Sequence, residues 1–318
     1  MAKVSVIVPV YNVASYVEKC ARSLFGQTLD DMEFIFVDDC SPDNSIQIVQ
    51  NVLEGYPSRK EQVRFLKNEH NLGQAGSRTR AMKIASGDYI IHCDSDDWVE
   101  SDMYKTLYDR AIQTNADIVT CDYFDELPNE TIIVGKEVYE DPHSNILHLK
   151  SKPHFTFTWH LIKREIIVSN KLFPVQGLNM WEDLLVVIKA YYFANKIEHV
   201  KKPLYHYNKC NVSATTSHPF SDKYLEQEKQ CVSNLEEFFS DKDIDFTNLA
   251  LILKKMIRDR YLYQTPPNYK KWRECYPEAA DVKLSFEHPN KVYVMAYNMA
   301  KKGFLFPLKL YQWMASHR

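Results

Sequence analysis

Three carboxylates stand together in the run Asp94-Ser95-Asp96-Asp97, directly after the mostly apolar stretch 89–93. Carboxylates this close repel one another unless a cation or a proton lies between them. Mg²⁺ and Mn²⁺ prefer oxygen ligands, and proteins usually hold them with one or two carboxylates while substrate phosphates complete the shell. Because open α/β sheets bind ligands at the carboxyl ends of their strands, this run predicts a site for a metal ion and a diphosphate. A solvated acidic loop is the alternative for an isolated motif of this length.

Further polar groups are expected at the same edge of the sheet. Asp38-Asp39 ends the second apolar stretch, where a carboxylate can accept hydrogen bonds from a nucleobase or a ribose. We expect Asp38 to support the loop and Asp39 to face the pocket, and we expect the ring of Tyr11 to stack on the base. Arg78 lies early in a following helix, where a guanidinium group can pair with phosphate. Arg80 is equally well explained as a surface residue of that helix.

A third acidic group, Glu182-Asp183, follows Trp181 at the start of an amphipathic helix. Carboxylates at a helix N-terminus are stabilised by the macrodipole, so capping is one explanation. A catalytic role for these carboxylates is the other explanation. Transfer of a sugar from a nucleotide diphosphate needs a cation for the leaving group and a separate base for the acceptor hydroxyl. Asp183 is our candidate for that base.

The elements that must position these groups alternate between strand and helix over the first 125 residues. Apolar, β-rich stretches predict strands, and the intervening 3.6-residue periodicity predicts helices at about 14–27, 74–86 and 101–114. The expected strands are Lys3–Val10, Phe34–Val37, Val63–Leu66, Tyr89–Cys93 and Asp117–Cys121. This alternation favours βαβ units and a parallel sheet.

Beyond residue 124 the pattern is less regular. We expect one or two strands within Glu130–Tyr139, a helix over Asp183–Ala194, and two short strands at Ile197–Val200 and Leu204–Tyr207. From about residue 220 the pattern is helical without further strands. We therefore predict a domain boundary near residue 215.

Composition excludes several classes of protein. The 318 residues carry a net charge of −3, which gives no reason to expect binding to nucleic acid. The seven scattered cysteines form no C-x-x-C, so neither disulfides nor a zinc site is expected. We expect a reducing, cytoplasmic location. Val4–Val10 is expected to be a strand and not a signal peptide, and no apolar run approaches the ~18 residues of a membrane span. The absence of G-x-G-x-x-G and of a P-loop argues against Rossmann dehydrogenases and P-loop NTPases.

The chain resembles the inverting nucleotide-diphospho-sugar glycosyltransferases called family 2, including bacterial capsular and O-antigen enzymes, from Val4 to about Thr216. The order and spacing of several motifs carry this resemblance. They are Val4-Ser5-Val6-Ile7-Val8-Pro9-Val10-Tyr11-Asn12, Val37-Asp38-Asp39-Cys40-Ser41-Pro42-Asp43, Asn71-Leu72-Gly73 with Arg78, Ser86-Gly87-Asp88-Tyr89-Ile90, and Asp94-Ser95-Asp96-Asp97.

The resemblance implies an α/β GT-A fold, with a mostly parallel sheet flanked by helices and a C-terminal helical region. It implies a catalytic domain over 1–215, made of a nucleotide-binding half (1–125) and an acceptor-side half (126–215), followed by helices over 216–318. The implied activity is transfer of a sugar, from a UDP-sugar, to a hydroxyl of a saccharide or lipid-linked saccharide in the synthesis of cell-surface polysaccharide.

Residue roles also follow from the resemblance. It implies that Asp96 and Asp94 bind Mn²⁺ or Mg²⁺, that Asp183 is the general base, and that Glu182 supports the base or touches the acceptor. The implied nucleotide-site residues are Pro9, Tyr11, Asp39, Arg78, Asp94 and Ser95. His206 lies in a segment typical of the capsular enzymes, either near the metal or packed. The family often has Ala-Arg-Asn where this chain has Ser77-Arg78-Thr79, which leaves the role of the Asn unassigned.

The tail, residues 288–318, mixes aromatic residues with lysines. This composition suits a helix at a membrane interface, giving peripheral contact with the inner face of the cytoplasmic membrane. Packing on the catalytic domain or a homodimer contact are the alternatives.

Two other functions fit less well. A sugar-nucleotide pyrophosphorylase would need a glycine-rich basic loop after the first strand, where this chain has Tyr11-Asn12-Val13-Ala14. A catalytically silent, nucleotide-binding scaffold subunit would not need the full set of carboxylates.

Overall fold

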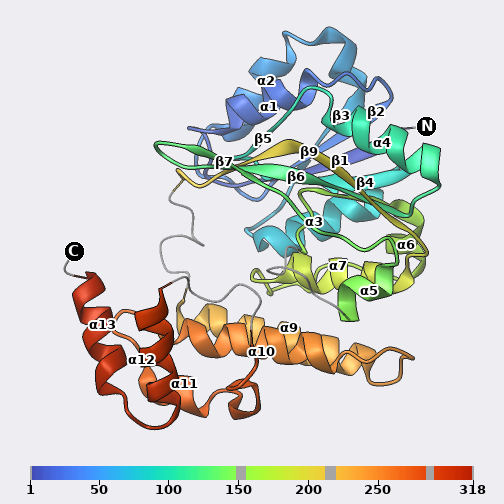
Figure 1. The fold of residues 1–318 in the computed structure, drawn as a ribbon. Coiled ribbons are helices and arrows are strands. Elements are labelled where there is room, and N and C mark those ends of the chain that lie inside the picture. Colours follow the sequence, from blue (N-terminus) through green and yellow to red (C-terminus); the bar gives the residue numbers. More distant parts are fainter. Residues whose placement is uncertain (1, 148–154, 212–219, 284–289, 317–318) are drawn as a thin grey trace.

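The computed structural model describes residues 2–147, 155–211, 220–283 and 290–316 (Figure 1). Its first half is a parallel sheet in the order β3-β2-β1-β4. These strands are β1 (Val4–Val10), β2 (Met32–Asp38), β3 (Val63–Lys67) and β4 (Tyr89–His92). β1 is buried along its whole length, as expected for a strand covered by helices on both faces. The strands predicted in this half are confirmed, with ends shifted by one or two residues.

Successive residues of a strand point to opposite faces, so β1 serves two cores. Val6 and Val8 pack under one helical layer, and Ile7 packs under the other. The first layer contains α1 (Val17–Phe25), α2 (Ser45–Leu53) and α4 (Met103–Thr114). The second contains α3 (Gly73–Ile84), α5 (Pro142–Leu147), α6 (Arg164–Ser169) and α7 (Glu182–Phe193). Figure 1 shows α1 and α2 on one side of the sheet and α3 and α7 on the other.

The second half of the sheet is mixed, continuing from β4 in the order β8-β6-β9-β5. Its strands are β5 (Trp98–Val99), β6 (Ile118–Glu126), β7 (Thr131–Val134), β8 (His160–Lys163) and β9 (Ile197–Asn208). β8 is antiparallel to both β4 and β6, and sequence analysis did not predict it. Both segments predicted as short strands, 197–200 and 204–207, are in strand conformation, but they belong to one strand, β9, whose register against β6 shifts where Cys121, Asp122 and Tyr123 meet it.

Beyond residue 220 the described residues form helices and no strand, as predicted. These are α9 (Asp222–Phe239), α10 (Thr247–Arg260), α11 (Tyr269–Glu274), α12 (Lys291–Lys301) and α13 (Phe306–Ser316), with a short 3-10 turn at Pro277–Ala279 (η2). A second 3-10 turn, η1 (Pro57–Gln62), precedes β3 in the first half of the chain. α9 and α10 form a further layer below α7 in Figure 1 and contribute Leu235 and Leu253 to the second core. The boundary predicted near residue 215 lies outside the described residues. Among those residues, no helix is both long and apolar enough to cross a membrane.

Candidate active site

Arg78 joins two acidic segments that lie 88 residues apart in sequence. Its Nη2 donates to Oδ1 of Asp94 at 2.7 Å, and its Nη1 donates to Oε1 of Glu182 at 2.6 Å. The side chain of Arg78 is 3% exposed and that of Glu182 is 4% exposed. Arg78 comes from α3, Asp94 follows β4, and Glu182 opens α7, so one guanidinium holds three elements together at the edge of the sheet.

The two carboxyl groups that open α7 differ in their access to solvent. Glu182 is buried behind Arg78, whereas Asp183 is partly exposed and accepts a hydrogen bond from the amide of Leu184. Burial raises the pKa of Glu182 to about 7, against the opposing effect of Arg78. Burial likewise raises the pKa of Asp183 to about 6, again opposed by Arg78, and the nearby charge of Asp94 adds to the increase. Asp183 is therefore the group of the pair that is both accessible and suited to proton transfer near neutral pH.

Burial alone would lower the pKa of Arg78, but the neighbouring carboxylates of Asp94, Glu182 and Asp183 outweigh it and raise that pKa. The guanidinium is therefore a permanent positive charge within an acidic site. Gln74, one helical turn before Arg78, donates to the same Oδ1 of Asp94 at 3.1 Å. Residues four apart share one face of a helix, so α3 presents both donors to this carboxylate.

The acidic run itself is held by the end of β9. Asp97 is 1% exposed and accepts hydrogen bonds from the hydroxyl of Tyr205 at 2.5 Å and the amide of Asn208 at 2.8 Å. Asp96 accepts from Asn211 through its carboxylate and from Asn208 through its backbone carbonyl. Burial, followed by the charge of Asp94, raises the pKa of Asp96. Asp97 thus anchors the turn, while Asp94 and Asp96 face the site.

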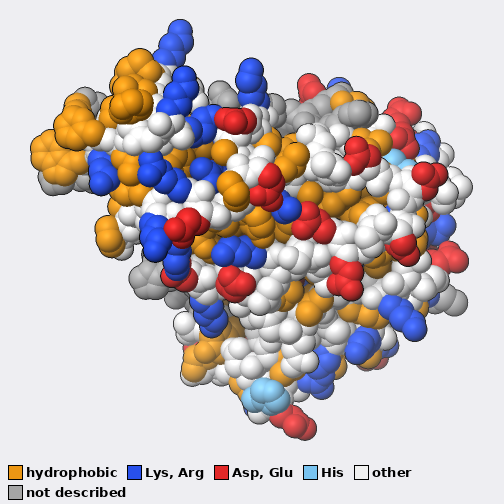
Figure 2. All heavy atoms as spheres, turned by 90° about the horizontal axis from the view of Figure 1, so that it is seen from below, with side chains coloured by type: hydrophobic (Ala, Val, Ile, Leu, Met, Phe, Trp, Pro, Cys, Tyr) orange, Lys and Arg blue, Asp and Glu red, His pale blue; other side chains and the backbone are white. Residues whose placement is uncertain are grey.

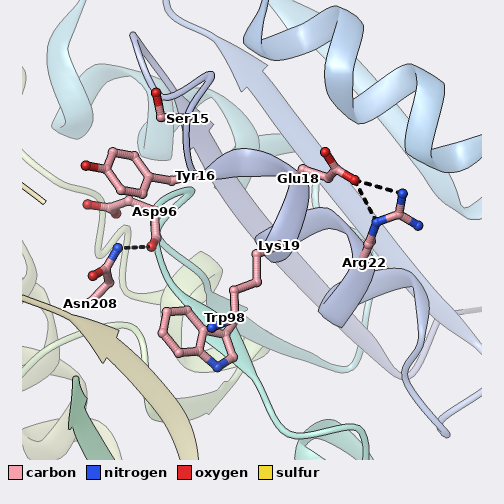
Figure 3. A pocket seen from close by; sticks show the side chains of 8 residues that line it. All are labelled: Ser15, Tyr16, Glu18, Lys19, Arg22, Asp96, Trp98 and Asn208. Atoms are coloured by element: carbon pink, nitrogen blue, oxygen red, sulfur yellow. Dashed lines mark hydrogen bonds and ion pairs between the residues drawn. The ribbon is translucent and has the colours of Figure 1, made fainter. Parts of the chain in front are cut away.

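Asp96 also lines a hollow of about 360 Å³ beside α1 (Figure 3). Figure 3 shows Asp96 and Asn208 on one side of this hollow and Glu18, Lys19 and Arg22 of α1 on the other. The full lining is Ser15, Tyr16, Glu18, Lys19, Arg22, Asp96, Trp98 and Asn208. The ammonium of Lys19 lies over the ring of Trp98, 2.9 Å from its centroid, which brings a cation close to the acidic run.

His206 is packed and held on every side. Its ring stacks between Trp98 and Phe124, with centroid distances of 5.0 and 4.4 Å. Its two ring nitrogens contact carboxylate oxygens of Glu100 and Glu126 at 2.8 and 2.7 Å. Of the two positions considered from the sequence, the structure shows the packed one, and His206 fixes the end of β9 that carries Asn208.

At the end of β2 the two aspartates, Asp38 and Asp39, have different partners. Asp38 accepts from the amide of Ser41 and so supports the turn, as expected. Asp39 is 3% exposed and accepts from Asn68 and from the amide of Leu72, each at 2.7 Å. Arg80 is exposed on α3, as its interpretation as a surface residue predicts, and it donates to the side chain of Asn68 and to the backbone carbonyl of Lys67 in β3.

The remaining predicted nucleotide-site residues lie at the same edge of the sheet. Pro9 is buried within β1, Ser95 is buried next to Asp94, and the ring of Tyr11 is exposed. Asn12 and Cys40, which follow these strand ends, have φ values of 54° and 58°. Residues other than glycine rarely adopt this conformation, and it is concentrated at functional sites.

The segment before α7 connects the site to the C-terminal helices. Trp181 has a φ of 60°, and the guanidinium of Arg260 from α10 lies over its ring at 5.0 Å. The amide of Asn179 donates to Gln227 of α9, while its side chain accepts from the amide of Ala75 in α3. Thr79, which stands where the family often has Asn, donates to the backbone carbonyl of Pro174 in the segment before α7. The position of Asp183 therefore depends on α3, α9 and α10 together.

The acidic run fits a hard divalent cation in donor chemistry. Asp94 and Asp96 supply carboxylate oxygens, and Mg²⁺ or Mn²⁺ is commonly held by two carboxylates together with substrate oxygens. Among the described residues, no three His, Cys, Asp or Glu side chains gather into a site that could hold a metal by itself.

Several further groups support the site and were not predicted from the sequence. These are Gln74, Asn68, Asn179, Tyr205, Asn208 and Asn211. Only Gln74 had a local signal, its spacing of four residues from Arg78. The others reach the site through pairings between distant elements, which a single sequence does not reveal.

Comparison with known proteins agrees with this geometry. Residues 5–169 match the family model described as Glycosyl transferase family 2. EpsJ, an uncharacterized glycosyltransferase of Bacillus subtilis strain 168, is 30% identical over 244 residues, which are 71% of this chain and 67% of EpsJ.

Two solved structures share the fold at lower identity. TarS of S. aureus (residues 1–349), in complex with UDP-GlcNAc, superposes with a TM-score of 0.68 at 18% identity, over 98% of this chain and 91% of that one. The mannosyltransferase PcManGT of Pyrobaculum calidifontis, in complex with GDP-Man and Mn²⁺, has a TM-score of 0.59 at 14% identity. The superposition covers 97% of this chain and 86% of PcManGT. The match to the family model covers more than half of the chain, so this protein is a glycosyltransferase that belongs to glycosyl transferase family 2.

Proposed function

We propose that this enzyme moves a sugar from a UDP-sugar to a hydroxyl of a saccharide or lipid-linked saccharide, with inversion at the anomeric carbon, in the synthesis of cell-surface polysaccharide. The observation that carries the proposal is the buried bridge from Asp94 through Arg78 to Glu182. It sets the end of β4, where a diphosphate would lie, next to Asp183, the accessible carboxylate of α7.

In this proposal Asp183 is the general base. The acceptor hydroxyl gives its proton to Asp183, and its oxygen forms a bond to the anomeric carbon. The bond from that carbon to the diphosphate oxygen breaks on the opposite side, so the configuration inverts and UDP leaves. A pKa of about 6 keeps most of the Asp183 side chains ionised at neutral pH and still able to take up a proton. Arg78 holds Glu182, the neighbour of Asp183 in α7, and so fixes the position of this base.

Asp94 and Asp96 would hold the metal ion, Mn²⁺ or Mg²⁺, together with diphosphate oxygens. When bound, such an ion supplies positive charge that stabilises the departing diphosphate. The oxygen donors of the acidic run support this role, as does the Mn²⁺ in the complex of the structural neighbour PcManGT. Arg78 acts through the carboxylates it holds, because both of its terminal nitrogens are engaged by Asp94 and Glu182.

The nucleotide would lie across the ends of β1 and β2. We assign the exposed ring of Tyr11 to stacking on uracil. The buried carboxylate of Asp39 accepts from Asn68 and Leu72 through Oδ1, so we assign its Oδ2 to hydrogen bonding with the base. Pro9 and Ser95 shape the floor of this site. The choice of UDP is supported by the TarS complex with UDP-GlcNAc. A cytoplasmic location is supported by the seven cysteines, all of which are free thiols in the structure.

The test is the release of nucleoside diphosphate from a panel of sugar nucleotides, measured with Mn²⁺ and again with a chelator. We expect release from a UDP-sugar in the presence of metal, and the opposite anomeric configuration in the product by NMR. Release that is equal with chelator would remove the metal from the proposal. Binding of nucleotides without turnover of any donor would instead favour a silent subunit.

Asp183→Asn tests the base. We expect kcat to fall by about 10²–10⁴-fold, the range typical of a lost general base, with little change in the affinity for UDP. Asp109→Asn is a matched control, because Asp109 is an exposed carboxylate that pairs with Lys105 along α4. Normal turnover in Asp183→Asn would exclude Asp183 as the base.

A further inference from the structure

The hairpin of α12 and α13 exposes an unusual number of large hydrophobic side chains. The described residues expose seventeen such side chains, and eight of them lie within 291–316. Phe304 and Phe306 are 66% and 73% exposed, and Trp313 is 59% exposed. Figure 2 shows hydrophobic side chains projecting at the edge of the molecule that these helices form, with lysines beside them. Large apolar groups concentrated in this way mark a surface for interaction.

Each helix has two apolar faces, where a surface helix of a globular protein needs only one. The inner face of the hairpin is buried in the protein's own core. Tyr293, Ala296 and Ala300 of α12 and Leu308 of α13 pack with Trp272 there. The outer faces follow helical spacing of their own. They are formed by Val292, Met295 and Met299 on α12 and by Phe306, Leu310 and Trp313 on α13. The outer apolar residues are therefore not needed for the protein's own core.

The charge of the segment is one-sided. Residues 288–318 contain four Lys and one Arg but no Asp or Glu. Lys291, Lys302 and Lys309 are exposed, while Lys301 is paired with Asp281. A segment whose exposed residues are apolar or aromatic, and whose own charges are all positive, matches a lipid bilayer with an apolar interior and anionic headgroups. A second copy of the same surface would bring lysines against lysines, which disfavours a symmetric dimer.

We propose that the outer face of the α12–α13 hairpin binds the surface of an anionic lipid bilayer. Phe304, Phe306 and Trp313 enter the region between headgroups and acyl chains. The exposed lysines contact lipid phosphates. The helices lie in the plane of the interface and hold the enzyme on one leaflet.

The test is flotation of the full-length protein with vesicles of phosphatidylcholine, with or without about one-third phosphatidylglycerol. We expect flotation with the anionic vesicles that weakens as salt is added. Replacing Phe304, Phe306 and Trp313 by serine should weaken binding at least about tenfold. A control variant replaces three exposed apolar side chains elsewhere by serine and should float like the wild type; these are Ile112, Ile133 and Val168.

A lysine variant separates charge from apolar contact. Lys291→Gln, Lys302→Gln and Lys309→Gln together should weaken binding to anionic vesicles about a hundredfold, at roughly fivefold for each lysine near the surface. Brominated lipids should quench tryptophan fluorescence in the wild type and not in Trp313→Phe. Urea unfolding of each variant should match the wild type, because none of the replaced side chains belongs to a core.

Several results would overturn the proposal. One is failure of the wild type to float with anionic vesicles, and another is equal flotation of the serine variant. Flotation without quenching by brominated lipid would mean that a different surface binds. A dimer in light scattering that dissociates in the serine variant, without vesicle binding, would assign this face to a second copy of the chain.

Discussion

Replacing Arg78 by methionine should destabilise the fold, and the loss should depend on pH. Methionine has a similar length but no charge, so Glu182 would lose its cation while staying buried. Both side chains are no more than 4% exposed in the structure. Removing one partner of a buried ion pair typically costs about 3–5 kcal/mol. We expect a loss of free energy of unfolding in this range at pH 8, where Glu182 is ionised in the wild type.

The pH dependence follows from the pKa of Glu182, which burial raises to about 7 even beside Arg78. A carboxyl whose folded pKa is raised keeps a proton that the unfolded chain has lost. The free energy of unfolding therefore falls as pH rises, by about 1.4 kcal/mol per pH unit. In the wild type the free energy of unfolding stops falling near pH 7, where folded Glu182 loses its proton. In the variant it continues to fall above pH 7, because without the guanidinium the pKa of Glu182 is higher still. The difference between the two proteins should widen by up to about 1.4 kcal/mol from pH 7 to pH 8.

The assay is urea unfolding followed by tryptophan fluorescence, at pH 6 and pH 8. Adding Glu182→Gln to the variant removes the unpaired charge, so it should restore part of the stability and abolish the extra pH dependence. Arg22→Met is the control, because Arg22 forms an exposed pair with Glu18 and should change stability by less than about 1 kcal/mol. A loss in Arg78→Met that is equal at both pH values, or larger at pH 6, would refute the reasoning.

Three further predictions concern the site and its supports. Activity should fall as pH drops below about 6, because burial sets the pKa of Asp183 near 6 and the base must be unprotonated; a kcat/KM profile that stays flat to pH 5 would contradict this. Gly87→Ala should lower the free energy of unfolding by about 1–3 kcal/mol, because a Cβ there would lie 2.6 Å from the backbone amide of Ser5. Gly73 has a φ of +73°, and a Cβ there would lie 2.5 Å from Asn179. Gly73→Ala should therefore raise KM for the donor, with a stability loss of about 1–2 kcal/mol in thermal unfolding.

The parts of the fold predicted correctly were those with strong local patterns. β1 and β2 are continuous apolar runs, and such runs indicate buried strands without any knowledge of their partners. β8 has only four residues and gains its stability from pairing with β4 and β6, so no local pattern revealed it. In β9, Lys201 and Lys202 interrupt the apolar pattern at the point where the register against β6 shifts from Val200 to Pro203, and the strand continues beyond them.

The same distinction applies to the site. The acidic groups at 94–97 and 182–183 were found because residue type and position at an element's end already indicate chemistry. Their mutual contact was not readable from the sequence, because nothing in the residues around Arg78 indicated that its guanidinium holds two carboxylates from distant segments. Tyr205 and Asn208 escaped notice because their partner, Asp97, lies more than a hundred residues away.

The support of Trp181 and Asn179 by α9 and α10 has a consequence for protein engineering. Hybrid enzymes are often made by joining the front half of one relative to the rear helices of another. Here such an exchange would replace Gln227 and Arg260, which steady the residues just ahead of Asp183. Chimeras of this protein should therefore change turnover as well as any property of the tail, unless the junction falls after α10.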